Sequence, residues 1–204
     1  MSDYYGQNMK KWTVIQSTYL EKSRWVNWRI DTCRLPDGST VEDYHVAEFP
    51  PGVGIVAVTL ELEVVLVRQY RHGAGQTLTE IPGGYVSQDD RTPLEAAQRE
   101  LREETGYSSD RWLELASLSA HPTSHEYPIY LFMALDSRCT SEQLLDPTEY
   151  IEVVRVPLDR VSTMVEQGQL QSLGSTAGVA LAREKITTLG EGNQVGDLER
   201  ARPD

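Results

Sequence analysis

The chain has 204 residues and an ordinary globular composition, which suits one domain with a small extension. Its formal net charge of −12 disfavours DNA or RNA as a partner, because their phosphates are bound through clustered Lys and Arg. The sequence has no run of about 18 apolar residues for a membrane span, and its N-terminus lacks the apolar core of a signal peptide. We therefore expect a cytoplasmic protein that binds neither nucleic acid nor a membrane.

The first fifty residues read as a disordered lead, 1–10, followed by strands. Strand patterns cover three ranges, with a Pro-Asp-Gly turn before the last of them: 13–20, 24–35 and 39–49. Trp25 and Trp28 do not share a face at the period of two that a strand requires. Three interpretations of these tryptophans stay open: core packing, a stacking surface for a nucleobase, or a dimer contact.

A Pro-Pro-Gly break then leads into a hairpin of two buried strands over 54–71, with its turn near Glu61. The hairpin ends in basic residues that include Arg71, and a short strand over 76–84 carries Glu80 just before two glycines. Basic residues at a strand end suit an anionic ligand, although a solvated strand terminus would look the same.

The clearest predicted helix begins at Thr92, where Thr-Pro-Leu-Glu has the pattern of a capping box with proline at the first helical position. Leu94, Ala97 and Leu101 give it an apolar stripe, and Gly106 is the expected stop.

After this helix the sequence alternates between strands and loops and then becomes helical. We expect strands over 111–120, 128–135 and 151–158, an acidic connection over 141–150, and helices over 159–170 and 175–186. A flexible acidic tail is expected at 187–204. This order predicts an α+β protein, with helices on both faces of a mixed sheet in an α/β/α sandwich.

Three carboxylates on the predicted helix are the strongest chemical signal. Glu100, Glu103 and Glu104 are three and four residues apart, which puts them on one helical face. Like charges at this spacing repel, and carboxylate oxygens are what Mg²⁺ or Mn²⁺ prefers. The alternative is an amphipathic surface helix with an acidic face.

The stretch Arg99-Glu100-Leu101-Arg102-Glu103-Glu104-Thr105-Gly106-Tyr107 resembles the second half of the Nudix box, with Gly84 as the glycine of the first half. The first half departs from the pattern: it has Asp90 where the family has glutamate, and eight residues instead of seven before Arg99. Arg91 is read as the inserted residue.

The resemblance implies the Nudix fold for 51–186 and an N-terminal β arm for 11–50, which is similar to the arm that pairs subunits in the ADP-ribose pyrophosphatase and nucleoside diphosphate sugar hydrolase branch. It also implies a homodimer formed through that arm. The implied cofactor is Mg²⁺ or Mn²⁺, in about two or three ions.

The resemblance further assigns roles to individual residues. The metal ligands would be Glu100, Glu103, Glu104 and the Gly83 carbonyl, and Arg99 would orient a ligand glutamate. Glu149, in an acidic loop after the box, would be an extra ligand. The general base stays open between three residues: Glu103, Glu149 and Glu152.

Pro122 lies fifteen residues beyond Tyr107, a spacing similar to that of ADP-ribose pyrophosphatases. With the arm it favours a nucleotide-sugar substrate, to which Arg71 would bind through the phosphates and Glu80 through the base or ribose, with Trp28 as a stacking surface. The expected reaction is hydrolysis of the pyrophosphate bond of ADP-ribose or a similar compound. The alternatives are GDP-mannose or a dinucleoside polyphosphate as substrate, or a module that senses ADP-ribose without cleaving it.

Overall fold

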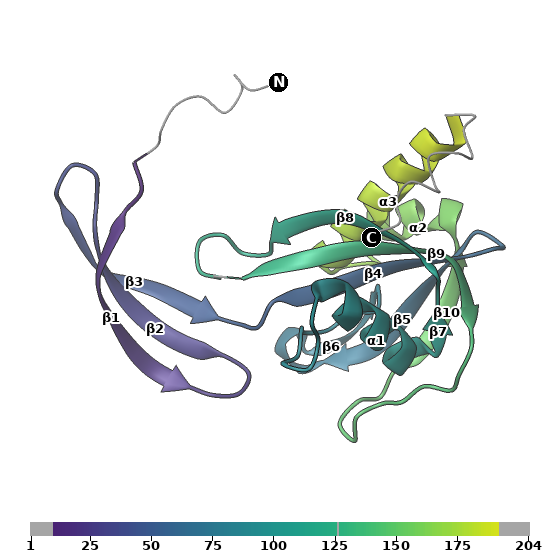
Figure 1. Ribbon diagram of the computed structural model, residues 1–204, viewed down its shortest axis with the longest axis horizontal. Coiled ribbons are helices and arrows are strands. Elements are labelled where there is room, and N and C mark those ends of the chain that lie inside the picture. Colours follow the sequence, from purple (N-terminus) through teal and green to yellow (C-terminus); the bar gives the residue numbers. More distant parts are fainter. Residues whose placement is uncertain (1–9, 126, 192–204) are drawn as a thin grey trace. The chain divides into compact units, whose positions relative to one another are not determined.

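The computed structural model describes residues 10–125 and 127–191 (Figure 1). The chain divides into two compact units, each of which is described by itself. The first comprises the chain up to Pro50 together with His121–Tyr127, and the second comprises the rest. Of the expected lead only Lys10 is among the described residues, and the expected tail lies outside them from residue 192 onward. Within the described part, no helix is long and apolar enough to cross a membrane.

The first unit is an antiparallel sheet of three strands in sequential order. The strands are β1 (Thr13–Lys22), β2 (Asn27–Arg34) and β3 (Thr40–Glu48). The expected turn before β3 is present: Asp37 accepts a hydrogen bond from the Ser39 amide, and Gly38 has a φ of 91°. The segment from His121 is attached to β3, because the Ala47 amide donates to the Ser124 carbonyl at 2.8 Å.

The tryptophans of this unit are exposed, so the interpretation that Trp25 and Trp28 pack in the core is wrong. Trp25 is 61% exposed in the turn between β1 and β2, and Trp28 on β2 is 40% exposed. All ten residues of β1 are exposed as well. The physical reason is that burying an apolar sheet face takes a second layer, and the described part of this unit has a single one.

The second unit contains a mixed sheet in the order β10-β5-β4-β9-β7, with β6 paired to β5 and β8 paired to β9. Its strands are β4 (Gly52–Thr59), β5 (Glu63–Arg71), β6 (Gln76–Glu80), β7 (Tyr107–Ser108), β8 (Arg111–Ser119), β9 (Pro128–Cys139) and β10 (Glu152–Pro157). The pair β4–β9 is parallel and the other pairs are antiparallel. A short 3₁₀ turn, η1 (His72–Ala74), joins β5 to β6. The expected hairpin near Glu61 is confirmed, while the acidic connection before β10 is irregular.

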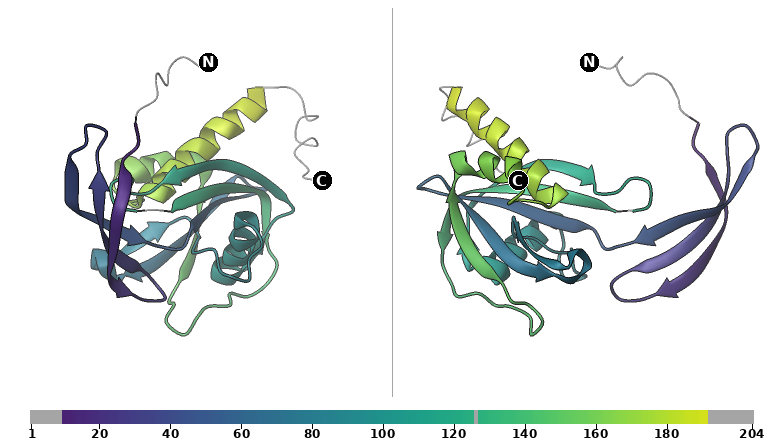
Figure 2. Two further views of the ribbon diagram at one scale, coloured as in Figure 1. Left: turned by 60° about the vertical axis from the view of Figure 1, so that its left-hand side comes forward. Right: turned by 180° about the vertical axis from the view of Figure 1, so that it is seen from behind.

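Helices cover both faces of this sheet, as predicted (Figure 2). Helix α1 (Pro93–Thr105) packs on one face, and α2 (Leu158–Glu166) and α3 (Leu173–Glu191) pack on the other. Helix α3 is longer than expected, because residues 187–191, assigned to the flexible tail, continue it. Thr187 and Thr188 donate their hydroxyl hydrogens to the carbonyls one turn earlier, those of Arg183 and Glu184.

Helix α1 has the predicted ends. Thr92 accepts a hydrogen bond from the Glu95 amide, and Gly106 closes the helix with a φ of 74°. The second half of the capping box differs, because the Glu95 carboxylate accepts from the Arg91 amide instead of the Thr92 amide. Leu101 is fully buried against the sheet, which fixes the rotation of the helix and turns its carboxylates toward the glycine loop.

Candidate active site

Two glycines bring the backbone against the carboxylates of α1. The Gly83 amide donates to Oε2 of Glu104 at 2.8 Å. A Cβ on Gly83 would lie 2.2 Å from the Val53 carbonyl oxygen, and one on Gly84 would lie 2.5 Å from the carboxyl of Glu100. At Gly83 the clash is with the backbone, so the close approach of the loop requires glycine there, while a side chain at position 84 would displace the carboxyl group of Glu100.

Arg99 holds two of the three box carboxylates. Its Nη1 donates to Oε1 of Glu100 and to Oε2 of Glu103, each at 2.9 Å. Its other nitrogens form a two-point contact with Asp90, Nε to Oδ1 at 3.1 Å and Nη2 to Oδ2 at 2.9 Å. Nη2 also donates to the Tyr85 carbonyl at 3.0 Å. The guanidinium therefore fixes the glycine loop, the segment before α1 and the helix face relative to one another.

Asp90 has a clear role that the departure from the family spacing had left open. The Arg99 guanidinium lowers the pKa of Asp90 to about 2, so its carboxylate is ionised over the whole working range of pH. The Ser87 amide also donates to it, at 2.8 Å. The inserted residue, Arg91, extends outward and pairs with Glu95, so the insertion is absorbed without displacing the pair between Asp90 and Arg99.

The remaining carboxylate, Glu104, is almost fully buried at 4% exposure. Its pKa is raised to about 8, chiefly by burial. The charges of Glu100 and Glu149 also raise this pKa, whereas the hydrogen bond from the Gly83 amide and the Arg71 charge lower it. Burial also raises the pKa of Glu100. Ionising both groups therefore costs free energy unless a cation is added to the site.

The donor set fits a hard divalent cation in its chemistry. Glu100, Glu103, Glu104 and Glu149 offer only carboxylate oxygens, and burial still raises the pKa of Glu100 and Glu104 although Arg99 pairs with Glu100 and the Arg71 charge acts on Glu104. Within the described ranges, no three such side chains are already gathered at metal-binding distances. Hydrogen bonds explain this, because Arg99 holds Glu100 and Glu103 while the Gly83 amide holds Glu104.

The acidic loop is fastened to the end of α1. Nε2 of Gln143 donates to the carbonyl oxygens of Glu104 and Ile151, at 2.6 and 3.3 Å. Glu149 closes a turn by accepting from the Asp146 amide at 3.0 Å, and its charge acts on both buried glutamates. The loop therefore brings Glu149 to the carboxylate cluster.

Glu152 is placed differently. It pairs with Arg68 at 3.0 Å and lies two residues before Val154, which packs on the α2–α3 side of the sheet. Because side chains alternate along a strand, the Glu152 carboxylate lies on the face opposite α1. The structure does not bring it to the box.

Arg71 and Glu80, both predicted to bind substrate, bind each other, with Nε to Oε2 at 2.7 Å. The Arg71 charge also acts on Glu104, which places it beside the carboxylate cluster. Trp28 and Pro122, the other two, are exposed residues of the first unit. Of the four residues predicted to bind substrate, Arg71 and Glu80 therefore lie near the box within the second unit.

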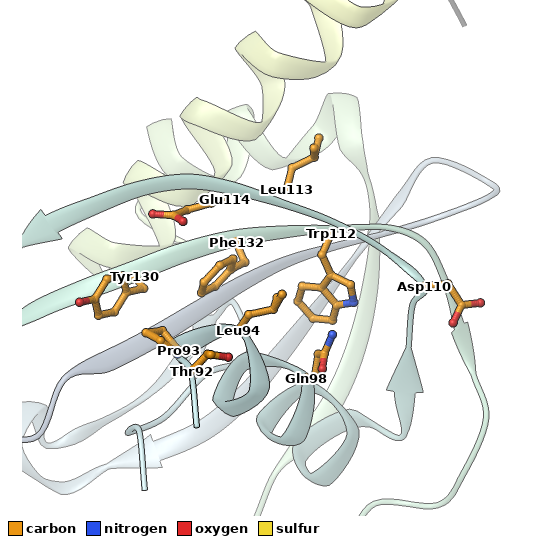
Figure 3. A pocket seen from close by; sticks show the side chains of 10 residues that line it. All are labelled: Thr92, Pro93, Leu94, Gln98, Asp110, Trp112, Leu113, Glu114, Tyr130 and Phe132. Atoms are coloured by element: carbon orange, nitrogen blue, oxygen red, sulfur yellow. The ribbon is translucent and has the colours of Figure 1, made fainter. Parts of the chain in front are cut away.

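A separate cavity lies beside α1 (Figure 3). The helical spacing puts the helix residues that line it, Leu94 and Gln98, on a side away from Glu100, Glu103 and Glu104. The volume of the cavity is about 770 Å³. Leu94 and Gln98 of α1 form one wall, and the rings of Trp112, Tyr130 and Phe132 on β8 and β9 form the other. Its walls are mainly aromatic and apolar, so it differs in chemistry from the acidic site.

Comparison with known proteins agrees with this geometry. The family model of the NUDIX domain matches residues 48–173, more than half of the chain. The chain belongs to the Nudix family of hydrolases. A second model, the nucleoside diphosphate sugar hydrolase N-terminal domain, matches residues 12–47. These two matches, together with relatives named ADP-ribose pyrophosphatase, place this Nudix hydrolase in the ADP-ribose pyrophosphatase and nucleoside diphosphate sugar hydrolase branch.

Named relatives include two ADP-ribose pyrophosphatases. The chain is 30% identical to that of Mycobacterium tuberculosis, over 78% of this chain and 77% of the relative, and 28% identical to that of Bacillus subtilis, over 69% and 76%. It is also 28% identical to the methanol dehydrogenase activator of Bacillus methanolicus, over 77% and 84%. A solved structure, an ADP compounds hydrolase, has the same fold, with a TM-score of 0.77, 22% identity and coverage of 93% of this chain and all of that one.

Replacing Asp90 by asparagine removes the charge that holds Arg99. The pKa of folded Asp90, about 2, is below the 3.8 of a free side chain. The pair therefore stabilises the fold above pH 4 and loses this effect as the pH falls toward 2, a contribution of about 2 kcal/mol. We expect Asp90→Asn to lower the free energy of unfolding by about this amount at pH 7 and by much less at pH 2.5, measured by urea denaturation. Asp89→Asn, at an exposed neighbour, is the control, and an equal loss at both pH values would contradict this account.

Proposed function

We propose that this Nudix hydrolase cleaves the pyrophosphate bond of ADP-ribose or another nucleoside diphosphate sugar, giving a nucleoside monophosphate and a sugar phosphate. The observation that carries the proposal is the arrangement of Arg99, Asp90 and the box carboxylates, which stores negative charge on one helical face beside a glycine loop. The match of residues 12–47 to the nucleoside diphosphate sugar hydrolase N-terminal domain supports a nucleotide sugar as the substrate class.

Hydrolysis of a pyrophosphate requires neutralised phosphoryl oxygens, an oriented water and a stabilised leaving phosphate. Bound Mg²⁺ or Mn²⁺, in about two or three ions, supplies this electrostatic stabilisation. Glu100, Glu103 and Glu104, with the Gly83 carbonyl and Glu149, are the residues that would hold the metal. Arg99 keeps two of these carboxylates in place, and Arg71 adds a positive charge beside Glu104 for the diphosphate.

For the general base we propose Glu149, with Glu103 as the second candidate. Glu149 belongs to a loop that Gln143 ties to α1, and its charge already acts on both buried glutamates. One oxygen of Glu103 is occupied by a hydrogen bond from Nη1 of Arg99, which leaves it less available to a water molecule. Glu152 is set aside as a base, because its carboxylate pairs with Arg68 on the other face of the sheet.

Glu104→Gln tests the metal-dependent reaction. We expect wild-type protein with Mg²⁺ or Mn²⁺ to hydrolyse ADP-ribose or another nucleotide sugar, and the variant to lose about a hundredfold or more in kcat. Removing a buried ionisable group should leave the fold at least as stable, so unfolding would not explain the loss. The assay measures phosphate released by a coupled phosphatase across nucleotide sugars, dinucleoside polyphosphates and nucleoside triphosphates.

Glu114→Gln, at an exposed carboxylate on β8, is the matched control and should keep full activity. Turnover that prefers dinucleoside polyphosphates would show that these compounds, and not nucleotide sugars, are the substrate class. Tight ADP-ribose binding without any turnover would show that the protein senses ADP-ribose and is not an enzyme.

Arg71→Ala tests the proposed phosphate contact. The side chain is 44% exposed and is held by Glu80, so its loss should disturb the fold little. We expect KM for the nucleotide sugar to rise about tenfold or more, with a smaller change in kcat, in steady-state kinetics. Arg155→Ala, which removes the exposed partner of Glu63, should leave both constants unchanged. An unchanged KM in Arg71→Ala would show that Arg71 does not bind the substrate phosphates.

A homodimer formed through the arm is the proposed assembly, and the cytoplasm is the proposed compartment. The arm exposes several large apolar side chains: Trp12, Val14, Ile15, Tyr19, Leu20, Trp25 and Trp28. An apolar surface of this kind marks an interaction site. Light scattering after gel filtration should give twice the chain mass for wild-type protein and a monomer for Val14→Glu combined with Leu20→Glu. A monomeric wild type at micromolar concentration would refute the dimer.

A further inference from the structure

The carbonyl groups at the end of α1 bind the chain that follows β9. The last carbonyl groups of a helix have no partner within the helix, so other groups must satisfy them. The Leu144 amide donates to the Glu103 carbonyl at 2.9 Å. The Glu104 carbonyl accepts from a side chain instead, because Nε2 of Gln143 donates to it at 2.6 Å. The beginning of the acidic loop is therefore bound to the same residues whose carboxylates form the box.

Gln143 also holds the far end of the acidic loop. Its Nε2 donates to the Ile151 carbonyl at 3.3 Å, and β10 begins at the next residue. These two hydrogen bonds form the Gln143 clamp, which joins both ends of the segment 144–150 to α1. Leu144 and Tyr150 are 74% and 85% exposed, so burial of their side chains does little to hold the loop. The clamp is correspondingly important for its position.

Glu149 has a defined place within this segment. Its amide donates to the Asp146 carbonyl at 2.9 Å, and its own Oε2 accepts from the Asp146 amide at 3.0 Å. The two bonds close a turn that fixes the carboxylate relative to the loop. The charge of this carboxylate acts on Glu100 and Glu104. The turn therefore orients Glu149 within the loop, and the Gln143 clamp holds the loop on the helix that carries the box.

We propose that Gln143 is a positioning residue for the reaction, whose two hydrogen bonds hold the acidic loop so that Glu149 can reach the attacking water. The inference rests on the proposed function and extends it, because it names the group that sets the place of the proposed base. A displacement of about 1 Å can cost about a hundredfold in rate. The contacts to the substrate phosphates lie on other residues, so loss of the clamp lowers kcat and leaves KM near its wild-type value.

The first test compares Gln143→Met with wild type. Methionine keeps the length and the unbranched stem of glutamine and removes both N–H donors. Because Gln143 is exposed, the substitution should leave the fold intact. We expect kcat for ADP-ribose with Mg²⁺ to fall about tenfold or more, and KM to change less than about twofold. Gln98→Met, the same substitution at an exposed position on another side of α1, is the matched control and should keep both constants.

A double-mutant cycle shows whether Gln143 acts through Glu149. A base that has been removed cannot be misplaced, so Gln143→Met should cause no further loss of kcat in Glu149→Gln protein. Equal fold losses in the two backgrounds would overturn the inference, since Gln143 would then act independently of Glu149. An unchanged kcat for Gln143→Met in otherwise wild-type protein would overturn it as well.

Hydrogen exchange measures the loop itself, in protein without substrate or metal. We expect the amides of residues 144–151 to exchange about tenfold faster in Gln143→Met, and those of β4 to keep their wild-type rates. Unchanged exchange in residues 144–151 would overturn the inference, because the clamp would not be holding the loop. In each of these cases, wild-type turnover of ADP-ribose would still support the proposed function. A wild-type protein that hydrolyses no nucleotide sugar would instead refute the proposed function, and the role of Gln143 with it.

Discussion

The site depends on one guanidinium that satisfies several anions at once. Arg99 donates hydrogen bonds to the carboxylates of Asp90, Glu100 and Glu103 and to the Tyr85 carbonyl. Without its positive charge, the carboxylates on this face of α1 would repel one another. A lysine could not replace it, because a single ammonium lacks the planar fork needed to bind Asp90 through both oxygens while reaching the helix.

The burial of Glu104 is the energetically unfavourable feature of this site. The side chain is buried beneath the glycine loop, where one amide hydrogen bond from Gly83 only partly compensates for the loss of water. The metal-free protein therefore holds a carboxyl group that resists ionisation, and cation binding and proton release are coupled at this position. Stability and readiness for metal oppose each other here, as is common at functional sites.

The features of this protein that depend on nearby residues in the chain could be predicted from the sequence. The Thr92 cap, the Gly106 stop and the spacing of Glu100, Glu103 and Glu104 are helix-local signals, and the alternation of strands and helices gave the layers. The Asp90–Arg99 pair was not predictable, because an inserted residue obscured the spacing. Core packing stayed among the open interpretations of the arm tryptophans, and was wrong, because a sequence does not reveal whether a sheet has a second layer.

The parallel pairing of β4 with β9 has a consequence for how the enzyme is made. Ile55 lies opposite Phe132. The glycine loop and α1, with its three carboxylates, lie between these two residues in the sequence. Such long-range pairing forms late, since its loop entropy must be overcome first. The glycine loop takes its backbone partners from β4, through the Val53 and Ile55 amides, and its side-chain partner from Glu104 of α1, all of which precede β9 in the chain. The acidic loop with Glu149 follows β9, so the last carboxylate reaches the others only after the strand that closes the sheet has been made.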